Sequence, residues 1–371
     1  IQALSDNGIK IENLKFDNII AAHLLGYQSK NITDLAAECL NHQTPNEYEI
    51  FSDIKKQISN LNIMKFANYS TNQSNLSWKL YSHLQNEIEK KKLTKIFYEI
   101  EMEFLYVLHQ IQSNGIPIDS EYLNKMSTEL SEEIEMITQK IYSSTGEKFN
   151  ISSSQQLSEI LFEKLNLPKM KKTKTGFSTD AASLMTLQNL VANENLETYK
   201  ILENILKYRH LTKIKSTYVD TIPKLTDQKT GKLHTVYNQT GTTTGRISSA
   251  EPNVQNIPIK TDLGLRVRKA FITQSQEKSV LMSADYSQIE LRVLAHFTKD
   301  QNLIQSFKNR IDIHSSTAAK IFKVPLEDIS EEMRRIAKIM NFGVIYGLSP
   351  YGISQQTGLT PEEGKKFTET Y

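Results

Sequence analysis

The chain has 371 residues, of which 39% are hydrophobic and 23% charged, and it contains only 14 glycines and 9 prolines. These proportions exclude a disordered, collagen-like or low-complexity protein, and they are typical of a folded protein with two or three domains. The single cysteine, Cys39, excludes an internal disulfide and a thiolate metal cluster. Any bound metal must therefore use carboxylate or histidine ligands.

The formal net charge of +2 says little about partners, but the charges are unevenly distributed. Segment 119–147 holds seven acidic residues and two lysines, whereas segment 204–234 holds seven Lys or Arg against two Asp. A second basic cluster consists of Lys169, Lys171, Lys172 and Lys174. A single charge run is usually a solvated face. Two basic tracts on a nearly neutral chain favour a polyanionic partner.

The longest weakly charged run, 339–361, does not predict a membrane span. It contains Asn341, Pro350 and Gln355, which are costly in lipid. We also expect no secretory or transit segment. The chain begins at Ile1 and ends at Tyr371 within a charged, helix-like stretch, so we expect a piece of a longer protein.

The amino-terminal half of the chain reads as helical. Residues 1–92 show mixed helical patterns that end in the charged segment 87–92, a predicted domain edge. Apolar spacing and capping residues then predict four further helical stretches: 96–112 closed by Gly115, an acidic helix over 120–142, a serine-capped start at 152–156, and a helix that ends at Ile222 before Pro223.

The pattern changes at His234. Residues 234–238 are strand-like, and Gly, Thr and Ser dominate from there to Pro258. The alternation of Val280, Met282 and Ala284 predicts a strand that delivers Asp285 at its carboxyl end. Residues 288–297 and most of the remainder show helical spacing. The predicted layout is helical, then sheet-bearing, then helical again, without an internal repeat.

Four residues spaced four apart give the strongest local signal: Arg334, Lys338, Phe342 and Tyr346. On a helix they form one stripe, with two cations followed by two aromatic rings. Such a stripe suits a triphosphate and then a base, because Arg and Lys bind phosphate oxygens and aromatic rings stack. The alternative is an ordinary amphipathic helix with buried aromatics and solvated cations, and the spacing alone favours that alternative.

Segment 285–292 carries Asp285 and Glu290, and oxygen ligands of this kind suit a divalent metal such as Mg²⁺. The alternative is a strand-to-helix turn with a carboxylate near the helix start.

Segments 244–249 and 252–258 are rich in Gly, Ser, Asn and Gln, and Arg246 in the first of them can reach a base edge. They are equally typical of surface turns.

Segment 312–314, Asp-Ile-His, places the imidazole of His314 where it can approach phosphate, although a lone histidine is usually structural.

Taken together and in order, these motifs resemble the polymerase core of family A DNA polymerases, the bacterial DNA polymerase I type. The motifs are Thr-Gly-Arg, Pro-Asn-Val-Gln-Asn-Ile-Pro, Asp-Tyr-Ser-Gln-Ile-Glu-Leu-Arg, Asp-Ile-His and Arg-Arg-x-x-Lys-x-x-Asn-Phe-Gly-x-x-Tyr-Gly. The resemblance runs from about residue 95 to the end and is weaker over 1–92.

The resemblance implies a helix-rich α/β (α+β) fold shaped as a right hand. It implies a partial, inactive RNase H-like proofreading-exonuclease-type domain over 1–92, a thumb over 93–230, a palm over 231–300 and incomplete fingers over 301–371. The implied activity is that of a DNA-directed DNA polymerase, which adds deoxynucleotides to a primer 3′ end by two-metal phosphoryl transfer in replication or repair. The implied cofactor is Mg²⁺, two ions in the completed site, and the implied partners are primer–template DNA and dNTPs.

The resemblance also assigns roles to individual residues. It gives catalysis to Asp285, Arg334 and Lys338; metal binding to Asp285 and the Tyr286 carbonyl; nucleotide binding to Tyr286, Gln288, Glu290, His314, Arg334, Lys338, Phe342 and Tyr346; and DNA binding to Arg246, Asn253, Gln255, Asn256, Tyr346 and Gly347. Glu290 would exclude a ribose 2′-hydroxyl, and Phe342 would disfavour dideoxynucleotides. We therefore expect Glu290→Ala to admit ribonucleotides and Phe342→Tyr to change dideoxynucleotide use.

Two departures from the family pattern qualify these expectations. The second metal-binding aspartate of the family lies in a His-Asp-Glu motif beyond the position of Tyr371, so we expect this chain to be inactive alone and to need a further carboxyl-terminal segment. In the first domain, Asp17 falls where the family has a metal aspartate. However, Gln73 stands where the family has the aspartate of Tyr-x-x-x-Asp, so we expect no proofreading.

Two other functions stay open on these residues. A single-subunit RNA polymerase shares the Lys and Tyr pattern, but Glu290 and Phe342 favour deoxynucleotides. The other alternative is a non-catalytic DNA-binding fragment or accessory protein, because this sequence does not contain the family's second metal-binding aspartate. In a bacterium we expect a cytoplasmic, nucleoid-associated location, with an organelle or a virus-infected cell as the alternatives.

Overall fold

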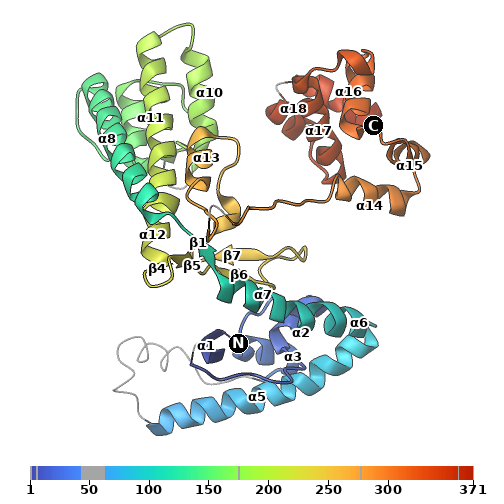
Figure 1. The fold of residues 1–371 in the computed structure, drawn as a ribbon. Helices are drawn as coiled ribbons and strands as arrows, with labels where there is room; N and C mark the ends of the chain where they lie inside the picture. Colours follow the sequence, from blue (N-terminus) through green and yellow to red (C-terminus); the bar gives the residue numbers. More distant parts are fainter. Residues whose placement is uncertain are drawn as a thin grey trace. The chain divides into compact units, whose positions relative to one another are not determined.

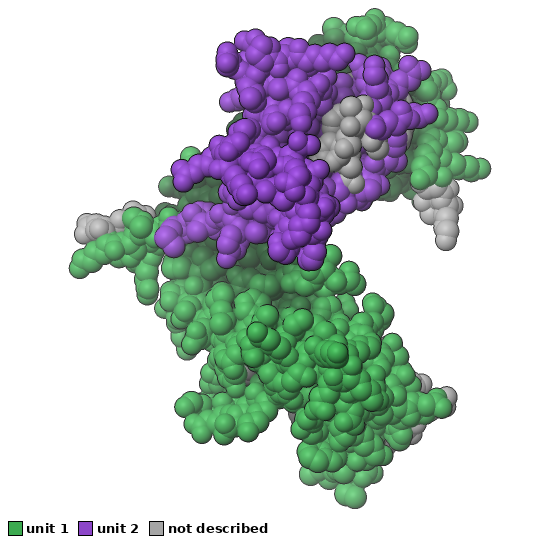
Figure 2. All heavy atoms as spheres, turned by 90° about the vertical axis from the view of Figure 1, so that its right-hand side faces the viewer, with its two compact units in different colours: residues 1–281 green, residues 282–371 purple. Residues whose placement is uncertain are grey.

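The computed structural model describes residues 2–5, 7–42, 63–173, 176–275, 278–357 and 359–370 (Figure 1). Lys174 of the second basic cluster and the terminal Tyr371 lie outside the described residues. The chain divides into two compact units, Ile1–Leu281 and Met282–Tyr371, which are coloured separately in Figure 2. Each unit is described by itself.

The amino-terminal part of unit 1 is helical, as predicted. Its elements are α1 (Gln2–Ser5), α2 (Asn18–Leu25), α3 (Ile32–Leu40), α5 (Ile63–Lys90), α6 (Thr94–Ile96), the π-helical turn η2 (Phe97–Glu101) and α7 (Met102–Asn114). Asp17 starts α2, because its carboxylate accepts hydrogen bonds from the backbone N–H groups of Ile19 and Ile20 at 2.8 and 2.9 Å. Leu35, Leu80 and Phe97 are fully buried in the core that these helices share.

The second helical part of unit 1 carries the larger apolar core. It consists of α8 (Ser120–Thr145), α9 (Ser154–Glu159), η3 (Ile160–Lys164), α10 (Ala181–Val191), α11 (Leu196–Ile214), η4 (Lys215–Val219) and α12 (Thr221–Leu225). The predicted acidic helix and the serine-capped start are confirmed: α8 begins after Asp119, and Ser153 caps α9. Leu130 of α8 and Leu202 of α11 are fully buried in the shared core.

Short antiparallel strands join these helices. The described strands form a three-stranded sheet in the order β1 (Ile116–Pro117), β5 (Lys232–Leu233), β4 (Thr226–Asp227), and the pairs β2 (Lys172–Thr173) with β3 (Gly176–Phe177) and β6 (Val236–Asn238) with β7 (Ser248–Ala250). Tyr237 of β6 lies opposite Ser249 of β7. The 3-10 turn η5 (Val254–Asn256) and helix α13 (Asp262–Arg268) follow. The strand predicted at 234–238 is confirmed for its last three residues.

The regular structure described in unit 2 is helical throughout. Its elements are α14 (Ile289–Thr298), α15 (Gln301–Lys308), α16 (Ile313–Phe322), the 3-10 turn η6 (Leu326–Asp328), α17 (Glu331–Ile345), α18 (Pro350–Thr357) and α19 (Pro361–Thr370). Its apolar core is small, with Ile336 and Met340 of α17 packed near Ile353 of α18.

Two local predictions were wrong. Residues 278–288 form no strand, and Val280 and Met282 are 89% and 88% exposed, because no described segment lies beside them to accept their backbone hydrogen bonds. Pro223 does not end a helix at Ile222 either. It occupies the first turn of α12, where a backbone N–H has no helical partner to lose.

Candidate functional site

Helix α17 presents the predicted stripe. Arg334 and Lys338 are exposed and one turn apart, and Phe342 follows half-buried. The backbone N–H of Tyr346 donates to the Phe342 carbonyl at 3.0 Å, which continues the helical spacing, and Tyr346 is 64% exposed. The opposite face, with Ile336 and Met340, is buried. The stripe therefore faces outward, so the alternative with both aromatics buried does not apply.

A carboxylate that the sequence did not single out holds the first cation of this stripe. Asp312 precedes α16, and Arg334 donates to it from Nε at 2.7 Å and from Nη2 at 3.2 Å. Asp312 is also the N-cap of α16: its Oδ2 accepts hydrogen bonds from the backbone N–H of Ser315 at 3.1 Å and from the Ser315 hydroxyl at 2.6 Å. Gln288 Nε2 donates to Oδ1 at 2.8 Å.

The surroundings of Asp312 keep it ionised. Partial burial raises the pKa of Asp312, but the hydrogen bonds from Arg334 and Ser315 and the positive charge of Arg334 outweigh that burial and hold the pKa well below its usual range. The pair is therefore charge-assisted at any physiological pH.

His314 is only 2% exposed and lies between α16 and α17. Its Nδ1 is 3.0 Å from Nδ2 of Asn341, and its ring centroid is 5.6 Å from that of Phe342. Thr317 donates to Asn341 Oδ1 at 3.2 Å, which assigns the amide N–H₂ to the His314 side and leaves the imidazole proton on Nε2. Burial lowers the pKa of His314, and the nearby charges of Arg334 and Lys338 lower it further against Asp312. The imidazole is therefore neutral at pH 7.

Asn341 belongs to the quoted motif of α17, but sequence reasoning assigned it no role. It is fully buried, and it follows the apolar spacing of Ile336 and Met340 on the inner face of the helix. A polar residue at a core position of an amphipathic helix is the signal that pointed to it, because a buried amide needs hydrogen-bond partners.

A cavity of about 570 Å³ opens beside Asp312 within unit 2. It is lined by Ser287, Gln288, Arg292, Phe307, Arg310, Ile311, Asp312 and Arg334. Arg292 lies over the Phe307 ring at 4.4 Å from its centroid, and its Nε donates to the Ser287 carbonyl at 2.9 Å. With three guanidinium groups and one carboxylate, the cavity suits an anion. Sequence reasoning included Arg292 in the 285–292 motif without assigning it a role, and it did not single out Arg310.

Asp285 lies in the exposed segment before α14, and Tyr286 beside it is 80% exposed. Glu290 is half-buried in the first turn of α14. Within the described residues, no group of three His, Cys, Asp or Glu side chains comes together to hold a metal ion. Mg²⁺ is commonly bound by one or two carboxylates together with substrate phosphates and water. The exposed carboxylate of Asp285 therefore fits as one protein ligand of such an ion.

In unit 1, the predicted DNA-contact residues lie on the two sides of β7: Arg246 stands in the connection from β6 to β7, and Asn253, Gln255 and Asn256 lie in the turn after β7. Asn253 Oδ1 accepts the backbone N–H groups of Gln255 at 3.1 Å and Asn256 at 3.3 Å. Tyr218 anchors this turn to the core, because its hydroxyl donates to the Asn256 carbonyl at 2.6 Å. Arg246, Gln255 and Asn256 are exposed. The turn is thus structured and offers polar side chains to solvent.

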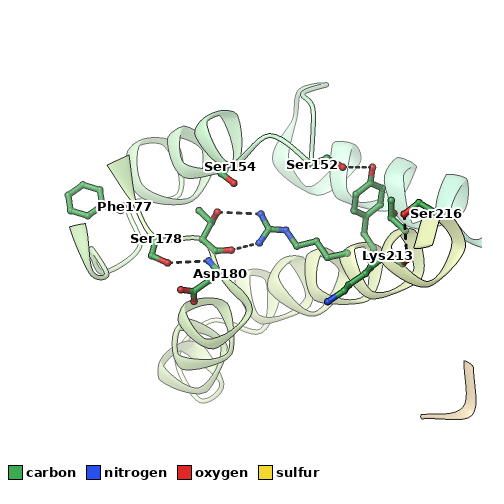
Figure 3. A pocket seen from close by; sticks show the side chains of 11 residues that line it. Ser152, Ser154, Phe177, Ser178, Asp180, Lys213 and Ser216 are labelled. Atoms are coloured by element: carbon green, nitrogen blue, oxygen red, sulfur yellow. Dashed lines mark hydrogen bonds between the residues drawn. The ribbon is translucent and has the colours of Figure 1, made fainter. Parts of the chain in front are cut away.

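Unit 1 contains a cavity of about 700 Å³ that is rich in hydroxyl groups (Figure 3). It is lined by Ser152, Ser154, Phe177, Ser178, Thr179, Asp180, Tyr208, Arg209, Thr212, Lys213 and Ser216. The half-buried Arg209 donates to the carbonyl of Thr179 and, at 3.3 Å, to its hydroxyl. Thr212 Oγ1 is buried and has no hydrogen-bond partner within the described part of the chain.

The basic tract 204–234 contributes Arg209 and Lys213 to this cavity. Burial lowers the pKa of Arg209, and the charge of Asp180 opposes that shift. The lining serines come from separate parts of the chain: Ser152 and Ser154 lie at the start of α9, Ser178 lies before α10, and Ser216 lies in η4. The basic tract was therefore visible in the sequence, whereas the hydroxyl groups that gather beside it were not. Hydroxyls beside two cations form a surface that suits phosphate oxygens.

No helix among the described residues is both long enough and apolar enough to cross a membrane.

Comparison with known proteins gives a consistent result. The family model for DNA polymerase family A matches residues 120–371. The chain is 40% identical to DNA polymerase I of Borreliella burgdorferi over 368 residues, which is 99% of this chain and 39% of that protein. It is 38% identical to DNA polymerase I of Geobacillus stearothermophilus, over 100% of this chain and 41% of that protein. The chain thus spans about two fifths of the length of these relatives.

A solved structure, the POL domain of Pol1 from M. smegmatis in complex with DNA primer-template and dNTP, superposes with a TM-score of 0.83 at 33% identity. The match covers 99% of this chain and 60% of that one.

Proposed function

The chain belongs to DNA polymerase family A, and from that premise we propose that it is part of a DNA-directed DNA polymerase that extends a primer 3′ end with deoxynucleotides. The observation that carries this proposal is the outward stripe of α17, where two exposed cations precede two aromatic rings at one-turn spacing. The family match over 120–371 includes every residue of that stripe.

Nucleotide binding follows from this order of side chains. Arg334 offers a planar set of N–H donors and Lys338 a mobile charge, so both suit triphosphate oxygens. Lys338 would also serve as the acid that protonates the departing pyrophosphate. Phe342 packs against the sugar and base, and Tyr346 with Gly347 lies by the templating base. His314, with its proton on Nε2, offers a hydrogen-bond donor to phosphate at the edge of the same site.

The remaining nucleotide contacts come from the start of α14. Gln288 and the Tyr286 carbonyl face the same phosphates, and Glu290 crowds the sugar so that a 2′-hydroxyl does not fit. Asp285, with the Tyr286 carbonyl, would hold Mg²⁺. When bound, the two ions activate the primer hydroxyl and neutralise the pyrophosphate. The proposed subdomains remain the thumb over 93–230, the palm over 231–300 and the fingers over 301–371.

DNA binding involves unit 1. The minor groove of the primer–template contacts the exposed side chains of Arg246, Gln255 and Asn256. Asn253 fixes the turn that carries the last two, because it accepts their backbone N–H groups. The hydroxyl-rich cavity beside Lys213 takes a phosphate of the DNA backbone. The M. smegmatis POL domain was solved with both primer-template and dNTP, which supports both ligands for this chain.

Residues 1–92 act as a proofreading-type domain without proofreading activity. The carboxylate of Asp17 accepts two backbone hydrogen bonds at the N-terminus of α2. Gln73 Nε2 donates to the Thr33 hydroxyl at 2.8 Å. These bonds are structural ones and support the expected loss of metal ligands. For the bacterial protein we propose a cytoplasmic location with the nucleoid.

Primer extension tests the proposal. We expect the full-length native protein, supplied with Mg²⁺ and dNTPs, to extend a primed template, and the 371-residue chain alone to fail. Asp285→Ala should reduce extension by about a thousandfold, since removing a metal ligand costs several kcal/mol at tenfold per 1.36 kcal/mol. Glu327→Ala, which removes an exposed acid of the same unit, is the matched control.

Two outcomes would replace this proposal. DNA binding without extension by the full-length protein would identify a DNA-binding protein that has lost catalysis. Preference for ribonucleotides by the unaltered protein would identify an RNA polymerase, whereas their admission only in Glu290→Ala would support the proposed sugar selection.

A further inference from the structure

We propose that Asp312 is a positioning residue for nucleotide binding, which fixes the guanidinium of Arg334 so that its other edge faces the triphosphate. This inference rests on the proposed function and adds to it a residue that touches neither nucleotide nor metal. Asp312 stands 22 positions before Arg334 in the sequence and reaches it from the start of another helix.

The geometry of the ion pair indicates that Asp312 orients the guanidinium of Arg334 and does not block it from binding phosphate. Arg334 pairs through Nε and Nη2, which lie along one edge of the planar guanidinium group, at 2.7 and 3.2 Å. Within the described part of the chain, Nη1 on the other side has no hydrogen-bond partner. Arg334 also retains 46% exposure of its side chain and lines the cavity of unit 2. A phosphate oxygen therefore binds Nη1 without displacing Asp312.

Asp312 is itself held rigidly. Its Oδ2 accepts two hydrogen bonds from Ser315 in addition to Arg334 Nε, and its Oδ1 accepts Gln288 Nε2 in addition to Arg334 Nη2. Five donors saturate one carboxylate, so its orientation is fixed from α14, α16 and α17 together. Because Arg334 is paired with this fixed carboxylate, its side chain is held in one orientation, although it could otherwise rotate about four bonds.

The charges around the cavity explain why a carboxylate is needed there. Arg292, Arg310 and Arg334 all line the cavity, and Asp312 is the acidic residue that lines it with them. Without it, mutual repulsion of the guanidinium groups would turn Arg334 away toward solvent. With it, the cavity keeps an excess of positive charge and still attracts a triphosphate.

An isosteric substitution separates this role from helix capping. Asn and Asp cap helices equally well, so Asp312→Asn keeps the bonds from Ser315 and removes the charge that holds Arg334. In the full-length protein we expect Asp312→Asn to raise the KM for dNTP about tenfold with a smaller change in kcat, the size of a lost charge-assisted hydrogen bond.

The matched control is Glu332→Gln. Glu332 pairs with Arg335 through two hydrogen bonds of 2.7 and 2.6 Å on the same helix, and this variant breaks a similar ion pair that is remote from Asp312. We expect its KM to stay at the wild-type value. Thermal unfolding of both variants checks that the fold is retained.

A double-mutant cycle gives the decisive readout. If Asp312 acts through Arg334, Arg334→Ala combined with Asp312→Asn should raise KM no further than Arg334→Ala alone. Multiplicative effects of the two substitutions would overturn the inference, as would an unchanged KM for Asp312→Asn. A lower KM would also overturn it, because Asp312 would then restrain Arg334 from binding phosphate. A wild-type protein that extends no primer would instead refute the proposed function.

Discussion

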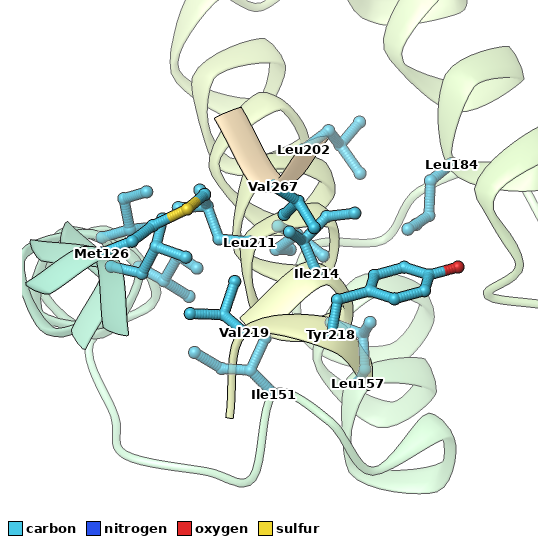
Figure 4. Close-up of a cluster of buried hydrophobic side chains, with 14 of the residues drawn as sticks. Met126, Ile151, Leu157, Leu184, Leu202, Leu211, Ile214, Tyr218, Val219 and Val267 are labelled. Atoms are coloured by element: carbon cyan, nitrogen blue, oxygen red, sulfur yellow. The ribbon is translucent and has the colours of Figure 1, made fainter. Parts of the chain in front are cut away.

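The helical core around α8 and α11 and the helical unit of α16 and α17 are stabilised by different interactions. In the first, Leu157, Leu202 and Leu211 pack with other apolar side chains away from water (Figure 4). In the second, the apolar core is small, and the contact between helices includes the buried His314 and Asn341.

This difference separates a scaffold from a site. Burying a leucine contributes about 1.5–3 kcal/mol and demands only that the side chain be apolar and of the right size. A buried hydrogen bond contributes about 1 kcal/mol net but fixes direction, and it costs more when one partner is removed. In unit 2 the polar groups that orient the helices also lie next to the groups proposed to bind nucleotide.

The largest effect should come from the apolar core. Leu202→Ala should lower the free energy of unfolding by about 3 kcal/mol, because Leu202 is fully buried and its removal leaves a cavity. Chemical denaturation followed by circular dichroism measures this loss. Leu190→Ala on the neighbouring α10, where the side chain is 53% exposed, should cost less than about 0.5 kcal/mol. Equal losses would show that packing at Leu202 is not special.

A smaller effect is expected when the polar contact of unit 2 is broken. Asn341→Ala should cost about 2 kcal/mol, because it leaves the buried Nδ1 of His314 without its donor. Thr317→Val removes one hydroxyl that donates to Asn341 and should cost about 1 kcal/mol. The same denaturation experiment compares them. If Asn341→Leu were more stable than wild type, the contact would be needed for orientation alone.

The pH dependence of the ion pair should be smaller still. Because the folded state lowers the pKa of Asp312, its charge stabilises the fold fully above the pKa of an unfolded aspartate, about 3.9, and this contribution declines as the pH falls below that value. Asp312→Asn should therefore be less stable than wild type at pH 7, by at most about 1 kcal/mol for a partly exposed pair. Thermal unfolding at pH 7 and pH 3 should show the gap narrowing; a gap that widens at pH 3 would contradict the assignment.

The smallest effect concerns the face that unit 1 presents to DNA. Lys213→Gln should reduce the slope of log K against log salt by about 0.9, which is about a threefold loss of binding at moderate salt. Fluorescence anisotropy with a primed duplex measures the slope. Lys200→Gln on the same helix, exposed but outside the cavity, should leave the slope unchanged. Identical slopes for all three proteins would remove this cavity from the DNA surface.

Much of the fold was predictable from local sequence. The helix over 120–145 and its start after Asp119 follow from apolar spacing and a capping side chain, which are properties of neighbouring residues. The helical spacing of Arg334, Lys338 and Phe342 on α17 was predictable in the same way, whereas the exposure of this stripe was not, because the spacing alone favoured buried aromatics. The strand predicted before Asp285 failed because alternation describes a strand only when a second strand lies beside it, and that partner is not visible in the segment itself.

The site was predictable as a set of motifs but not as a set of contacts. Arg334 and His314 were found, whereas the residues that hold them, Asp312 and Asn341, acquire their roles from the packing of α16 against α17. The serines of the unit 1 cavity are likewise gathered from separate helices. Partners brought together by tertiary structure leave no local pattern.

The backbone of Gln288 adds a constraint on how this region can vary. Its φ of 51° lies in the left-handed region, which costs a side chain other than Gly, Asn or Asp about 1 kcal/mol. A β-branched replacement would be penalised by conformation before any contact is lost, and glycine would relax the backbone while discarding the amide that holds Asp312. Selection for a more stable protein and selection for a better-organised site would therefore favour different residues at this one position.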